Sequence, residues 1–259
     1  MALDLQAYTL PAIFVVSLVL ILVGSELGRR LGARTRGRGD ANDSTLEAAI
    51  LGLLALMISF TFAMGLSRFE ARRDAVLNEA NAIGTTALRA RLLPEPHGSA
   101  SVKLLRDYVR IRLHLNQTLG TKRELDAAIA QSNEIQESLW QHAIAMAEKD
   151  SGIVPTGLFI QALNDMIDNQ EKRLTALRNR VPNIVLMALY GIAIIANAFA
   201  AYGGALETRR SRLPVYAMGV LVAAVILLIQ DLDRPGTGFI RVSQQPMLDT
   251  AASIASFSK

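Results

Sequence analysis

The chain has 259 residues, of which 51% are hydrophobic, and its mean hydropathy is positive. This composition is too apolar for a soluble protein of this length and is typical of a small protein with several membrane spans. The absence of cysteine excludes disulfides, thiolate metal sites and cysteine nucleophiles. The net charge of +4 comes from scattered arginine clusters rather than from a basic stripe, so we expect no nucleic-acid partner.

Four charge-free stretches are long enough to cross a bilayer as helices, given a hydrocarbon core about 30 Å thick. They are residues 5–25, 48–67, 181–206 and 213–230. The first stretch is expected to be a retained membrane helix rather than a signal peptide. It is preceded by Asp4 and lacks the basic leader that a signal peptide has. The following residues, 26–42, contain five arginines among glycines and are expected to form a flexible loop at the membrane surface.

The polar segment between the second and third spans shows helical periodicity and no strand-like alternation. The second span enters this segment without a proline or another break, so residues 47–93 are expected to form one long helix. Three further helices are expected over residues 102–115, 121–150 and 155–180. Together they predict a soluble helical bundle that is continuous with the second membrane helix.

The predicted fold class is therefore an all-α integral membrane protein with four transmembrane helices and a helical-bundle insert between the second and the third. Residues 1–67 hold the first two membrane helices and their arginine-rich loop, and residues 68–180 hold the bundle. Residues 181–230 hold the third and fourth membrane helices, and residues 231–259 form a C-terminal tail.

The long helix carries a recognisable pattern: Phe60, then SRFEAR at residues 67–72, then ALRARLLP at residues 87–94. This pattern resembles the second helix of prokaryotic bestrophin channels. There an apolar pore helix ends in phenylalanine and runs into an Arg-aromatic-x-x-Ala-Arg-like segment, and a Leu-Pro follows that segment about two dozen residues later. The runs EANAIG at residues 79–84 and DLDRP at residues 231–235 are similar to a bacterial bestrophin-like family of unknown function. That family is a distant relative of the bestrophin anion channels.

The resemblance implies a multi-pass protein of the bacterial inner membrane that assembles with itself, as a pentamer if it follows the bestrophin plan. It implies passive conduction of small anions such as chloride through a pore lined by the second membrane helix, in contact with the lipid bilayer and without a cofactor. The alternative is a non-conducting scaffold or signalling protein whose helical insert binds a partner.

Gly52, Leu56 and Phe60 are spaced four residues apart and share one stripe of the second membrane helix. The resemblance places them at the hydrophobic neck of the channel, where Phe60 agrees in type, Leu56 agrees as an apolar residue and Gly52 departs. In a ring of subunits, such apolar rings could gate ion flow by dewetting. The alternative is that the stripe only packs against sister helices.

A second candidate set consists of charged and polar residues at the membrane edges, as ion pairs or gating groups. Because a helix C-terminus disfavours anions, the aspartates after the fourth span need partners, for which nearby arginines are the candidates. A cation site is the alternative, although the arginine beside the two aspartates argues against Ca²⁺. The set is Arg68, Arg72, Arg73, Glu79, Asn81, Asp231, Asp233 and Arg234.

The sequence contains no Ser/His/Asp arrangement, phosphate-binding glycine loop or dinucleotide fingerprint. His97, His114 and His142 do not have metal-ligand spacing. We therefore expect neither an enzyme nor a metal site.

The side of the membrane on which the insert lies is left open by two opposing arguments. The positive-inside rule puts the arginine-rich residues 26–42 and 207–212 in the cytoplasm, and therefore the insert outside. The bestrophin resemblance puts the insert and both termini in the cytoplasm.

Overall fold

The computed structural model describes residues 8–35, 42–117, 122–149, 154–206, 212–236 and 238–257. These residues form α-helices and contain no strand, which confirms the predicted all-α class. The helices are α1 (Leu10–Arg34), α2 (Asn42–Ala90), α3 (His97–Gln117), α4 (Lys122–Lys149), α5 (Val154–Arg178), α6 (Asn183–Leu206), α7 (Leu213–Leu232) and α8 (Gln245–Ser256).

Four stretches among the described helices are long and apolar enough to cross a membrane. They lie in α1, in α2, within Val154–Leu206, where α6 supplies the apolar part, and in α7. The predicted multi-pass membrane class is therefore correct. The chain divides into two compact units, and α2 runs without a break through the boundary between Arg68 and Phe69.

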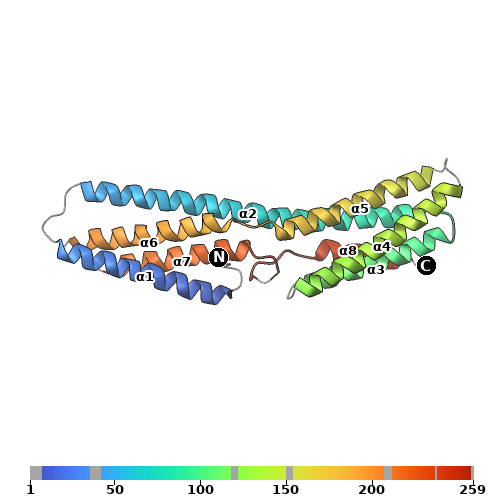
Figure 1. Cartoon of the computed structure of the whole chain (residues 1–259). Coiled ribbons are helices and arrows are strands. Elements are labelled where there is room, and N and C mark those ends of the chain that lie inside the picture. Colours follow the sequence, from blue (N-terminus) through green and yellow to red (C-terminus); the bar gives the residue numbers. More distant parts are fainter. Residues whose placement is uncertain are drawn as a thin grey trace. The chain divides into compact units, whose positions relative to one another are not determined.

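The first unit holds α1, α2 as far as Arg68, α6 and α7. Its core is an apolar cluster contributed by all four helices, and α1 and α6 run side by side in it (Figure 1). Fully buried members include Ile21 on α1, Leu189 on α6, and Ile226 and Ile229 on α7. This is the arrangement expected of membrane helices that bury their shared faces and leave the others to lipid or to another subunit.

Helix α1 corrects one expectation, because it continues to Arg34 where a loop was predicted from residue 26. The reason is a glycine at every fourth position, Gly24, Gly28 and Gly32, all of which are buried. A Cβ built on Gly28 would lie 2.0 Å from the carbonyl oxygen of Ala198 on α6. The glycines thus let the two backbones approach closely, as small residues do in membrane helix pairs. Residues 36–41 of the predicted loop lie outside the described residues.

The second unit holds α2 from Phe69 onward, α3, α4, α5 and α8. Figure 1 shows the shorter helices beside the C-terminal half of α2, and their buried apolar residues form one cluster. Ile83 on α2, Leu105 on α3, Leu139 on α4 and Phe159 on α5 are fully buried there. The periodicity predicted the buried faces of α3, α4 and α5, since their buried residues recur at helical spacing.

Helix α8 lies in the segment that the sequence presented as a tail. Its Met247 and Ile254 are fully buried in the core of the second unit. Thr250 donates a hydrogen bond to the carbonyl oxygen of Ala80 on α2 over 3.2 Å, and the Arg91 guanidinium lies 4.5 Å from the ring centre of Phe257. The end of the described chain is therefore an integral part of the helical bundle.

Candidate functional site

The apolar stripe of α2 lies on the face that is open in the single chain. Leu56 and Phe60 are 50% and 61% exposed, and nothing lies within 4 Å of a Cβ built on Gly52. The opposite face of α2 is buried at Leu54 and Thr61 within the first unit. An exposed apolar stripe in a membrane-spanning helix faces lipid, a sister subunit or a pore.

The carboxylate of Asp231, at the end of α7, is held by backbone amides. Its two oxygens accept hydrogen bonds from the N–H groups of Phe239 at 2.7 Å and Ile240 at 2.9 Å. Gly238 allows the carboxylate to approach this backbone, because a Cβ there would lie 2.3 Å from Asp231 Oδ1. Among the described residues, amide groups therefore take the place of the arginine partner that was expected for this aspartate.

The neighbouring Asp233 and Arg234 fasten two other segments of the first unit. Asp233 Oδ1 accepts a hydrogen bond from the backbone N–H of Val181 at 2.9 Å, just before α6. Arg234 Nη1 donates to the carbonyl oxygen of Tyr8 at 2.7 Å, just before α1. Both side chains are more than nine-tenths buried. The DLDR run therefore holds the ends of three segments together.

The polar residues of α2 have different surroundings. Arg68 is half-buried, and its Nε has no hydrogen-bond partner among the described residues. Arg72 is 3% exposed, whereas Arg73 and Asn81 lie at the surface. Arg73 forms an exposed ion pair with Asp74 at 3.3 Å, a type of contact worth about 0–1 kcal/mol.

Glu79 is the centre of a buried ionic cluster in the second unit. Its Oε1 accepts a hydrogen bond from Arg112 Nε on α3, and its Oε2 accepts one from Arg173 Nη1 on α5, each at 2.6 Å. Glu79 and Arg112 are fully buried, and Arg173 is 2% exposed. One carboxylate is thus shared by two guanidinium groups, and the three side chains connect α2, α3 and α5.

Neutral polar side chains extend this cluster to the remaining helices. Tyr108 donates a hydrogen bond to Gln170 Oε1 at 2.7 Å, and Gln136 Nε2 on α4 donates to the same oxygen at 3.0 Å. Arg173 Nη2 donates to Gln244 Oε1 at 3.0 Å, at the start of α8. We call this set the Glu79 network; it comprises Glu79, Tyr108, Arg112, Asn133, Gln136, Gln170, Arg173 and Gln244.

Burial raises the pKa of Tyr108 above its usual range, and the charge of Glu79 adds to the effect. Tyr108 therefore remains a neutral phenol that donates a hydrogen bond. The network is a buried polar core built around an ionic cluster. Such a core specifies how five helical segments meet, and it is costly to leave incomplete.

Glu79 was a candidate from the sequence, whereas its partners Arg112 and Arg173 were not. Tyr108 and Arg112 are one turn apart on α3 and share the apolar face formed by Leu105 and Val109. A polar or charged residue at a core-facing position of an amphipathic helix is a signal that something must pair with it. That signal is visible in the sequence, although it does not identify the partner.

A histidine pair connects α3 to α4 in the same unit. His97 Nδ1 and His142 Nδ1 are 3.2 Å apart, and the rings meet edge to face with centroids 5.4 Å apart. Burial lowers the pKa of His142, and the neighbouring His97 contributes to the shift. Only one nitrogen of the pair can donate while the other accepts, so the contact requires at least one neutral ring.

Acidification is expected to weaken this contact and destabilise the second unit. The folded-state pKa of His142 lies below its ordinary value of 6.5, so the unfolded chain takes up this proton first as the pH falls. The contribution to stability is therefore complete above that value and lost below it. Between about pH 7.5 and about pH 5.5, the unfolding temperature should fall more steeply for the wild type than for His142→Gln. Equal slopes would show that the pair does not control this dependence.

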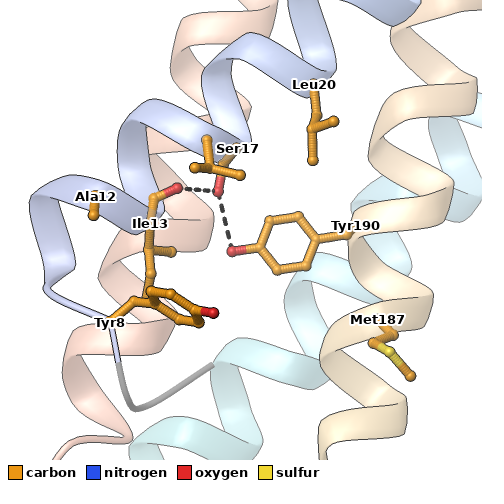
Figure 2. A pocket seen from close by; sticks show the side chains of 8 residues that line it. Tyr8, Ala12, Ile13, Ser17, Leu20, Met187 and Tyr190 are labelled. Carbon is orange, nitrogen blue, oxygen red and sulfur yellow. Dashed lines mark hydrogen bonds between the residues drawn. The ribbon is translucent and has the colours of Figure 1, made fainter. Parts of the chain in front are cut away.

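The first unit contains an apolar cavity of about 470 Å³ between α1 and α6 (Figure 2). Ser17 and Tyr190 point toward each other beside it, with their hydroxyl oxygens 3.1 Å apart, and Ser17 also donates to the carbonyl oxygen of Ile13. Gln230 Nε2 on α7 donates to the Tyr190 hydroxyl at 3.4 Å. These contacts satisfy polar groups inside the membrane part. No charged side chain is among the residues that line the cavity.

The described residues contain no group of three or more His, Cys, Asp or Glu side chains that could hold a metal ion. Their fold defines a multi-pass all-α membrane protein with a second unit that is a helical bundle. The family model of the Bestrophin-like domain matches residues 13–247, and the chain belongs to this family. Comparison with curated proteins and with solved structures finds no significant match.

Proposed function

We propose that the chain forms a homo-oligomeric channel that passively conducts small anions such as chloride through a pore lined by α2. By the bestrophin resemblance, the oligomer is a pentamer in a bacterial inner membrane with the helical bundle in the cytoplasm. The observation that carries the proposal is the open stripe formed by Gly52, Leu56 and Phe60 on a membrane-spanning helix. Membership of the Bestrophin-like family supports it.

In this proposal, phenylalanine side chains and backbone dipoles along α2 set the preference for anions. Residues 48–67 carry no charge, so a pore lined by them has no ring of carboxylates to attract cations. Phe60 and Leu56 of each subunit would form apolar rings that control wetting of the pore. Gly52, one helical turn before Leu56, has no side chain. The pore would therefore be narrowed at Phe60 and Leu56 and wider at Gly52.

The Phe60→Ala variant is expected to raise the conductance or the open probability severalfold in planar bilayers. The reason is that a pore lined by alanine at this position is wider and loses its water less readily. Leu27→Ala is a matched control, since Leu27 is 56% exposed on α1 and outside the proposed pore. Its currents should equal those of the wild type. Unchanged currents from well-folded Phe60→Ala oligomers would contradict the pore assignment.

A second candidate function is a non-conducting scaffold or signalling protein. The observation that favours it is the continuity of α2, which passes without a break from the membrane unit into the helical bundle. A partner bound to the bundle could then act on the membrane part through one helix. Absence of current under both anion and cation gradients favours this candidate over the channel.

A further inference from the structure

We propose that the helical bundle holds a small monovalent inorganic anion, of the size of chloride, at the Nη1 and Nη2 atoms of Arg112. Arg112 is fully buried, and only its Nε is engaged, by Glu79. The other two nitrogens are buried and have no hydrogen-bond partner among the described residues. A guanidinium group with its outer nitrogens aimed into a packed core is a ready anion receptor.

The charge balance of the Glu79 network requires a negative partner at this place. Among the described residues of this unit, Glu79 is the only buried carboxylate, and Arg112 and Arg173 share it. The three side chains therefore carry one net positive charge. Arg173 also donates a hydrogen bond to Gln244, so the guanidinium that still lacks an acceptor is that of Arg112. Removing an uncompensated charge from water costs several kcal/mol.

The other groups around the site cannot supply this charge themselves. Tyr108 is held as a neutral phenol, because burial raises its pKa. Gln136 and Gln170 are neutral amides that hydrogen-bond to Tyr108, to Asn133 and to one another. Water could accept hydrogen bonds from Arg112 but would not cancel the charge. A singly charged anion does both, and a dianion would reverse the imbalance.

Anion binding at Arg112 is independent of channel activity. The proposed pore lies in the first unit, whereas Arg112 lies in the bundle, and anion binding there can be measured on protein in detergent without any current. The ligand would be a resident anion that completes the polar core and links the stability of the bundle to the anion concentration.

The test is thermal unfolding of the purified full-length protein in sodium chloride or sodium gluconate of equal ionic strength. We expect the unfolding temperature to rise with chloride and to saturate, as for a ligand that binds only the folded state. Arg112→Gln should lose this dependence. Arg110→Gln is the matched control, because Arg110 is an exposed arginine on the same helix. It should keep the full dependence.

A second measurement keeps the test valid if Arg112→Gln does not fold. Crystals of the wild-type protein grown in bromide should show anomalous density beside Arg112 Nη1 and Nη2, with the guanidinium of Arg112 in contact. Equal unfolding temperatures in chloride and gluconate would overturn the proposal, as would an undiminished chloride effect in a folded Arg112→Gln protein. Water without bromide at this position would overturn it as well.

Discussion

The Glu79→Gln variant is expected to lose about 3–5 kcal/mol of unfolding free energy, because it removes the carboxylate that two buried arginines share. The amide keeps the shape of the side chain, so the loss reports on charge rather than on packing. The effect is confined to the bundle core, where Glu79 and Arg112 are both fully buried. Denaturant unfolding monitored by helical circular dichroism measures it.

The matched control is Glu70→Gln, which removes a carboxylate from an exposed position on the same helix. Surface substitutions of this kind change stability by about 0.5 kcal/mol or less. If Glu79→Gln lost no more stability than Glu70→Gln, the Glu79 network could not be the element that holds the bundle together.

The Gly28→Ala variant is expected to separate α1 from α6. The added Cβ would meet the carbonyl oxygen of Ala198 at 2.0 Å, together with two further backbone atoms of that residue, so no side chain can move aside to accept it. Overpacking of a tight core costs about 1–3 kcal/mol, and a backbone clash belongs at the upper end. Titration of the purified protein with a denaturing detergent measures this loss of stability.

Gly191→Ala on α6 is the matched control, and it is not expected to destabilise the protein. Nothing lies within 4 Å of a Cβ at Gly191, so this substitution adds helix propensity without a clash. It should leave stability unchanged or raise it by up to about 1 kcal/mol. If both glycine substitutions behaved alike, the close approach of the two helices at Gly28 would be refuted.

Local sequence pattern was sufficient to predict most of the helices. Charge-free length predicts the spans, and apolar spacing predicts the buried faces of α3, α4 and α5, because both signals lie within one helix. The end of α1 was misread because arginines and glycines together are typical of loops. The regular spacing of Gly24, Gly28 and Gly32 contained the correct interpretation.

The candidate sites were less predictable, because their geometry depends on several segments. Glu79 was identified as a candidate, but its partners come from α3 and α5, and one sequence does not show which helices meet. Asp231 is satisfied by backbone amides of a later turn, which no residue type announces. The spacing of Gly52, Leu56 and Phe60 was sufficient to place them on one stripe of α2. What this stripe contacts depends on how subunits assemble.

Whether the chain forms an anion channel is decided by the current that the purified wild-type protein carries in planar bilayers under opposing chloride and cation gradients. The particle mass is determined on the same sample. We expect a homo-oligomer of pentamer mass whose current has a reversal potential near that of chloride. A monomer or dimer without current would contradict the channel, as would an oligomer that conducts cations.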